Sequence, residues 1–130
     1  MPLPIGGWRL NVNGLEGGLM IESVETATSV VEGSIHAVSA LGNSRIRGSW
    51  NEATQCLTFV VIRVGSQDLV LPTFFRGLLF GSPLNAPPGQ DISWTLAGSV
   101  WDVTLSGDIG VHGTSRRNEF GWFAQLTQVV

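Results

Sequence analysis

The sequence predicts an all-β protein, and within that class an eight-stranded up-and-down antiparallel β-barrel formed by residues 1–130 as one domain. Short stretches alternate apolar and polar residues with period two, which is typical of strands with one buried face. Clusters of Gly, Asn, Ser or Pro separate these stretches at intervals of about ten residues, as in β-sandwiches and barrels. Short connections favour hairpins between consecutive strands, and hairpins favour the up-and-down barrel over the sandwich. No stretch places apolar residues at helical spacing between caps, so we expect little helix.

Five strands are predicted in the first half of the chain. The first begins at Trp8 and ends at Asn13–Gly14, a dipeptide that favours a tight turn. In the fifth, Leu57, Phe59 and Val61 share one face because side chains alternate along a strand. The second to fifth predicted strands cover residues 18–22, 30–38, 45–50 and 57–64, with turns at 41–44 and 51–54.

The second half of the chain predicts three further strands, at residues 73–80, 91–99 and 119–129. Residues 101–105 either extend the second of these after a bend at Gly98 or form a separate strand. Breaks are expected at 65–68, at the proline-containing segment 81–90 and in the glycine-punctuated stretch that follows residue 106.

Composition excludes several classes of function. Charged residues make up 13% of the chain, against about 25% in an average protein. Because few side chains are charged, more apolar surface must be removed from water, either inside a barrel or against a partner subunit. All seven basic residues are scattered arginines and the net charge is −3, so we expect no nucleic-acid partner. No apolar run is long enough for a membrane span, and residues 1–7 lack the features of a signal peptide, which leaves the compartment open.

The residues that most often hold metals do not cluster in the sequence. A metal site needs three or four converging ligands, and His36 and His112 lie on separate predicted elements without a paired-ligand spacing. We therefore expect no metal, and we expect His36 to face solvent on its strand. Cys56, the single cysteine, heads an apolar run, which predicts a buried and unreactive thiol.

An enzyme is an alternative that the sequence leaves open. The motifs of serine hydrolases, P-loop proteins and dinucleotide-binding proteins are absent. A barrel could still catalyse proton transfer with one perturbed carboxylate in its pocket, and Asp68, Asp91 or Glu119 could serve at a rim. Asp102 and Asp108 could form a pair, but a glycine-rich turn between them defines no geometry. No residue is singled out as catalytic.

Aromatic residues are the remaining signal, with five Trp and six Phe but no Tyr. Trp8, Trp50, Phe59, Phe75 and Trp94 all lie on alternating strands. Each of them could fill the core, because aromatic side chains bury large areas. As a set they could instead form the floor of a ligand cavity, since an eight-stranded barrel is just wide enough to hold one small molecule.

The order of short motifs resembles the avidin and streptavidin family of biotin-binding barrels. The strongest match is Thr73–Phe74–Phe75–Arg76–Gly77, which is similar to the family's T-x-W-x-G. The other matching segments are short and are spread over most of the chain: Gly6–Gly7–Trp8, Val31–Glu32–Gly33–Ser34–Ile35, Ile46–Arg47–Gly48–Ser49–Trp50, Ser93–Trp94–Thr95–Leu96 and Asn118–Glu119–Phe120.

The resemblance implies a ligand pocket inside the barrel. Thr73 matches a hydroxyl near the biotin sulfur, and Asn118 matches a residue that hydrogen-bonds the ureido ring. Phe75 stands for a pocket Trp, whereas Trp94 and Leu96 match apolar wall positions. The full set of implied ligand-binding residues is Leu10, Ile35, Ala37, Ile62, Thr73, Phe75, Trp94, Leu96 and Asn118.

Several matched positions have lost the polar group that the family uses on the ureido ring. Leu10, Ile35 and Ala37 stand where the family has Asn, Tyr and Ser, and Gly14 falls on a second Ser position. Each hydrogen bond lost from a buried ureido group costs about 1–3 kcal/mol. The resemblance therefore implies the barrel, with biotin binding weakened or lost and no other cofactor expected.

Two non-enzymatic functions follow from these observations. The first is a small-molecule-binding barrel with an apolar pocket for an apolar or biotin-like ligand. The second is a structural or interaction protein with a filled barrel, which assembles as a dimer or tetramer, as the resemblance also implies. The face expected to mediate assembly carries Phe74, Leu78, Phe80, Trp101 and Phe123.

Overall fold

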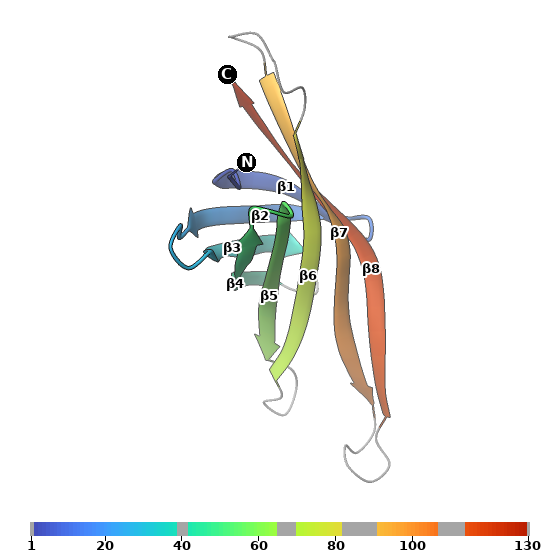
Figure 1. Ribbon diagram of the computed structural model, residues 1–130. Coiled ribbons are helices and arrows are strands. Elements are labelled where there is room, and N and C mark those ends of the chain that lie inside the picture. The colour runs from blue at the N-terminus through green and yellow to red at the C-terminus, as the bar shows by residue number, and fades with distance from the viewer. Residues whose placement is uncertain (1, 39–41, 65–69, 82–90, 107–113, 130) are drawn as a thin grey trace.

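Eight antiparallel strands form a closed barrel in the computed structural model, which describes residues 2–38, 42–64, 70–81, 91–106 and 114–129 (Figure 1). Each strand pairs with the next along the chain, and β8 returns to pair with β1. The predicted all-β, eight-stranded, up-and-down barrel is confirmed. The strands are β1 (Gly6–Val12), β2 (Leu15–Val24), β3 (Val30–Val38), β4 (Gly42–Asn51), β5 (Cys56–Val64), β6 (Val70–Gly81), β7 (Asp91–Ser106) and β8 (Thr114–Val129).

The last three strands are longer than the sequence predicts. β7 passes through Gly98 without interruption, so residues 101–105 extend the strand and do not form a ninth. β8 begins at Thr114, not at residue 119, and every residue of β7 pairs with one of β8. The predicted turn at 41–44 is also wrong in part, because β4 begins at Gly42. Continuous cross-strand pairing outweighs the local preference of glycine and serine for turns.

The barrel has two distinguishable ends. At one end of the barrel, β1 begins and the β2–β3 and β4–β5 turns lie; we call this the N-terminal end. We call the opposite end the mouth. Figure 1 shows β1–β4 running across the direction of β6–β8, and these longer strands extend beyond β1–β4 both above and below in the view. The β1–β2 turn at the mouth is the predicted Asn13–Gly14 pair, with φ of 49° and 87°. Positive φ at both residues is typical of the tight hairpin turn that this dipeptide favours.

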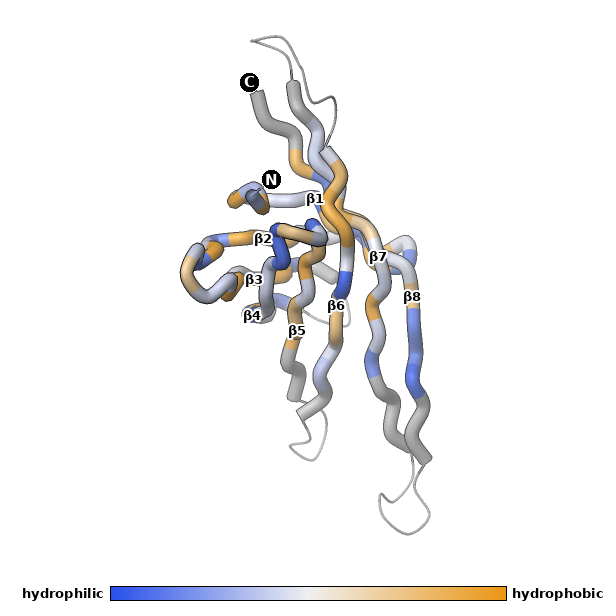
Figure 2. Tube along the Cα trace, viewed as in Figure 1, coloured by the Kyte–Doolittle hydropathy of each residue, from blue (hydrophilic) through white to orange (hydrophobic). Residues whose placement is uncertain are grey.

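Inward-facing apolar side chains form one buried core inside the barrel. Figure 2 shows hydrophobic and hydrophilic residues following one another along the strands. Phe59 and Phe75 stack with ring centroids 4.6 Å apart, and the Trp122 ring meets both edge-on at 5.8 and 5.4 Å. The Trp122 indole donates hydrogen bonds to the carbonyl oxygens of Arg76 and Ser99, at 3.1 and 3.0 Å. Cys56 is buried with a free thiol, as predicted.

Candidate functional site

Four of the nine predicted ligand-binding side chains belong to the hydrophobic core. Leu10, Ile35, Phe75 and Leu96 are almost completely buried among the other inward-facing residues. They are therefore packed against protein on all sides. The sequence could not distinguish packing from pocket lining, because both place apolar residues on the inner face.

The two predicted polar residues, Thr73 and Asn118, lie in one row on the inner face near the mouth. Asn118 pairs directly with Asp102 of β7. Phe74 pairs with Trp101, so Thr73 and Asp102 are the next positions along β6 and β7. We call Thr73, Asp102 and Asn118 the polar row. The barrel thus brings together residues that are 45 positions apart in the chain.

Hydrogen bonding links two members of the polar row and omits the third. The Asn118 side-chain amide donates to Asp102 Oδ1 at 3.0 Å, and both side chains are half-buried. The Thr73 side chain is only 3% exposed, and its hydroxyl has no hydrogen-bond partner within the described part of the chain. A buried hydroxyl without a partner costs about 1–3 kcal/mol, so this atom is an available site for a polar group of a ligand.

An uncovered aromatic ring lies beside the polar row. Phe120 is on the inner face of β8, opposite Val100, yet its side chain is 40% exposed. The register of β1 with β8 ends at Val12 and Trp122, followed by one hydrogen bond from the Asn13 amide to the Gly121 carbonyl oxygen at 3.0 Å. Beyond it, β8 has no partner on that edge among the described residues. The mouth therefore combines a buried hydroxyl, a carboxylate–amide pair and an exposed phenyl ring, which is the mixture typical of a small-molecule site.

Trp94 does not join this group. It lies eight positions before Asp102 on β7, which is about 26 Å along a strand. Its ring packs at the other end of β7, where an added Cβ at Gly81 would approach it to 2.6 Å. A small ligand at the mouth could not reach it. The side chains of the last two predicted residues, Ala37 and Ile62, lie outside the described residues.

Asp102 and Phe120 are site residues that the sequence analysis did not predict as such. The alternation of Leu96, Gly98 and Val100 extends to Asp102, so strand period two contains the signal. It could be used only once β7 was known to be continuous. Of the carboxylates that we considered for catalysis, Glu119 lies exposed on the outer face within 4.0 Å of Arg117. Asp68, Asp108 and the side chain of Asp91 are outside the described residues.

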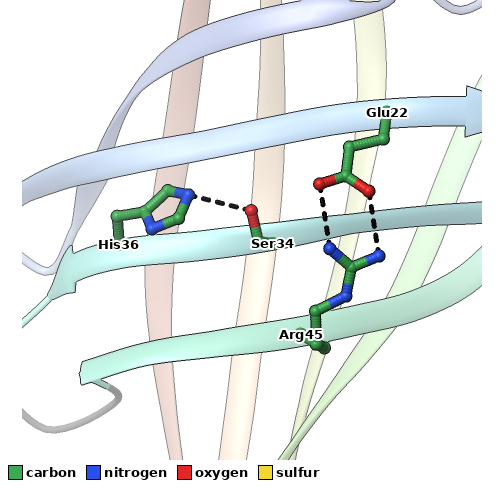
Figure 3. Close-up of polar contacts among 4 residues, drawn as sticks. All are labelled: Glu22, Ser34, His36 and Arg45. Atoms are coloured by element: carbon green, nitrogen blue, oxygen red, sulfur yellow. Dashed lines mark hydrogen bonds and ion pairs between the residues drawn. The ribbon is translucent and has the colours of Figure 1, made fainter.

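A second polar cluster lies on the outer face of β2–β4 (Figure 3). Glu22, exposed beside a bulge in β2, forms a double hydrogen bond with Arg45 across β3, both at 2.9 Å. This hydrogen bond lowers the pKa of the Glu22 carboxyl from its usual value. Beside the pair, on β3, Ser34 Oγ and His36 Nε2 are hydrogen-bonded at 2.8 Å. His36 is exposed, as predicted. Its ring provides the hydrogen-bond partner that the hydroxyl of the buried Ser34 needs.

Among the described residues, no group of three or more His, Cys, Asp or Glu side chains is arranged to hold a metal ion. None of the described segments is a helix long and apolar enough to cross a membrane. Comparison of the chain with protein-family models, curated proteins and solved structures found no match. The geometry of the mouth is therefore the basis on which a function can be assigned.

Proposed function

We propose that the protein is a small-molecule-binding β-barrel whose ligand occupies the mouth, against the polar row and Phe120. The observation that carries the proposal is the Thr73 hydroxyl, which is buried without a partner on the same row as the Asn118–Asp102 pair. Buried polar atoms are nearly always hydrogen-bonded, so a ligand or a bound water is expected there. The apolar body of the ligand would cover the exposed ring of Phe120.

Biotin is not the ligand that this arrangement favours. The family resemblance implies a biotin-like occupant, but Leu10 and Ile35 replace polar groups and belong to the core. No ureido ring could hydrogen-bond to those two side chains. We therefore propose an apolar ligand with one or two polar atoms, and a biotin affinity that is weak or lost.

Thr73→Val is expected to weaken ligand binding and to stabilise the free protein. Valine keeps the shape of threonine and removes the unpartnered hydroxyl, so the free energy of unfolding should rise by about 1 kcal/mol. Affinity for the uncharged apolar fluorophore N-phenyl-1-naphthylamine should fall about fivefold. Urea denaturation measures the first effect, and fluorescence titration of the same samples, alongside biotin, measures the second.

Ser34→Ala provides the matched control for this substitution. Ser34 is also buried, but its hydroxyl is bonded to His36, so its loss should destabilise the protein by about 1 kcal/mol and leave fluorophore binding unchanged. The proposal fails if neither biotin nor the fluorophore perturbs tryptophan emission, or if Thr73→Val binds the fluorophore as tightly as the parent chain.

The outer face of β6–β8 favours a second function, assembly of identical subunits into a dimer or tetramer. Phe74, Leu78, Phe80 and Phe123 are exposed on this face, as predicted, whereas Trp101 is half-buried under the stacked ring of Phe74. Leu78, Ala97 and Phe123 form one cross-strand row. The charged residues Arg76, Arg117 and Glu119 flank these apolar residues. Across a twofold axis, an arginine of one subunit could pair with Glu119 of the other.

Phe123→Lys is expected to abolish self-association. Its side chain is 43% exposed at the β8 end of the apolar row, and a lysine there would place two like charges close together in a twofold interface. Sedimentation velocity at micromolar concentration should show an oligomer for the parent chain and a monomer for the variant. A parent chain that sediments as a monomer would exclude this function while leaving the ligand site untouched.

A further inference from the structure

A second pocket lies at the N-terminal end of the barrel, the end opposite to the mouth. Its volume is about 210 Å³. This is below the range of typical drug-sized sites, so its occupant must be a compact molecule. Its principal walls are the apolar residues Leu3, Ile5, Val24 and Trp50, together with the acidic residues Glu25 and Glu52.

The segment that precedes β1 forms one wall of this pocket. Leu3 is only 4% exposed and belongs to the core, so residues 2–5 are held across the end of the barrel. Ile5 points its side chain outward and is 54% exposed. An exposed large apolar side chain next to the core, such as Ile5, is the kind of surface that an apolar ligand would cover.

The opposite wall is held in place by backbone hydrogen bonds. The Trp50 amide donates to the carbonyl oxygen of Ser29 at 2.9 Å, which ties β4 to the β2–β3 turn. Within that turn, the Ser29 amide donates to the carbonyl oxygen of Glu25 at 2.8 Å. The position of Glu25 relative to Trp50 is therefore set by the fold before any ligand binds, which reduces the entropic cost of binding.

The charges of the pocket select the ligand class. Two carboxylates line it, and none of the described residues in its walls is basic. An anion would be repelled, whereas a cation would be attracted to the exposed carboxylate of Glu25. The apolar walls require a hydrocarbon body attached to that cation.

We propose that this pocket binds a small organic cation, an alkyl- or arylammonium ion. The hydrocarbon lies between Leu3, Ile5, Val24 and Trp50, and the ammonium group faces Glu25. The proposal is independent of the ligand site at the mouth, since the two sites share no residue.

Three probes of similar shape test the ligand class: benzylammonium, benzyl alcohol and benzoate, each titrated into the ¹⁵N-labelled full chain. We expect benzylammonium to shift the indole N–H signal of Trp50, with an affinity that falls as salt is added. Benzyl alcohol should bind about two- to fivefold more weakly, and benzoate more weakly still. Binding of benzoate as strong as that of benzylammonium, or no shift with benzylammonium, would overturn the proposal.

Glu25→Gln tests the charge without threatening the fold, because Glu25 is exposed and its structural hydrogen bonds use backbone atoms. The affinity for benzylammonium should fall about two- to fivefold, and that for benzyl alcohol should not change. Equal affinities in the variant and the parent chain would contradict the proposed role. Thr73→Val should leave benzylammonium binding unchanged, so failure at one site does not imply failure at the other.

Discussion

Gly98→Ala is expected to destabilise the barrel by about 3 kcal/mol or more, enough to unfold many domains of this size. A Cβ atom added at Gly98 would lie 1.9 Å from the carbonyl oxygen of Arg76 and 2.7 Å from Cα of Gly77. Both are backbone atoms of the paired strand β6, so they cannot move aside as a flexible side chain could. The alanine would have to separate β6 from β7 at the place where Trp122 donates its two hydrogen bonds.

Gly121→Ala is the control for this effect. Gly121 pairs with Ser99 in the neighbouring register position, and nothing lies within 4 Å of an added Cβ. Its substitution should change the free energy of unfolding by less than about 0.5 kcal/mol. Urea denaturation followed by circular dichroism measures both variants. If Gly98→Ala proved as stable as Gly121→Ala, the close approach of β6 and β7 would not exist in solution.

Phe75→Ala should cost about 3–5 kcal/mol of unfolding free energy. The ring is 1% exposed, stacks on Phe59 and meets Trp122 edge-on, so its removal leaves a cavity in the middle of the barrel. The surrounding strands are joined into a closed barrel and can relax only slightly to fill it. Thermal and urea denaturation both measure this loss.

The preceding residue supplies a control of identical chemistry. Phe74 lies on the outer face, is 37% exposed and stacks only on Trp101, so Phe74→Ala should cost about 1 kcal/mol or less. Equal costs for the two substitutions would show that β6 is shifted by one residue, because a shift of one position exchanges the inner and outer faces of a strand.

The sequence predicted the inner and outer faces of the strands well. β3 has the predicted bounds, and the outward positions of Phe74, Leu78, Phe80 and Phe123 follow from alternation with the buried residues of the same strands. Side-chain direction in a strand depends only on position along that strand. It can therefore be read locally, without knowledge of the partners.

Prediction of the candidate site was less complete. Thr73 and Asn118 were predicted, and the structure places them in one row, but Asp102 between them and the exposed ring of Phe120 were not part of the prediction. Both depend on the length of the β7–β8 hairpin relative to β1. That length is decided by pairing between strands. The turn-forming residues near Gly98 and Asn118 locally indicate that the strands end there, which is misleading.

By itself, therefore, the sequence determined the fold class, the turn at Asn13–Gly14 and which side chains face inward. Only the tertiary structure decided that Thr73 is buried without a partner among the described residues, that Gly98 touches the backbone of β6, and that Leu3 is buried in the core. The physical reason is the range of the interactions. Alternation and turn preference act between neighbouring residues, whereas the contacts of these three residues join strands that are distant in the chain and meet only when the barrel closes.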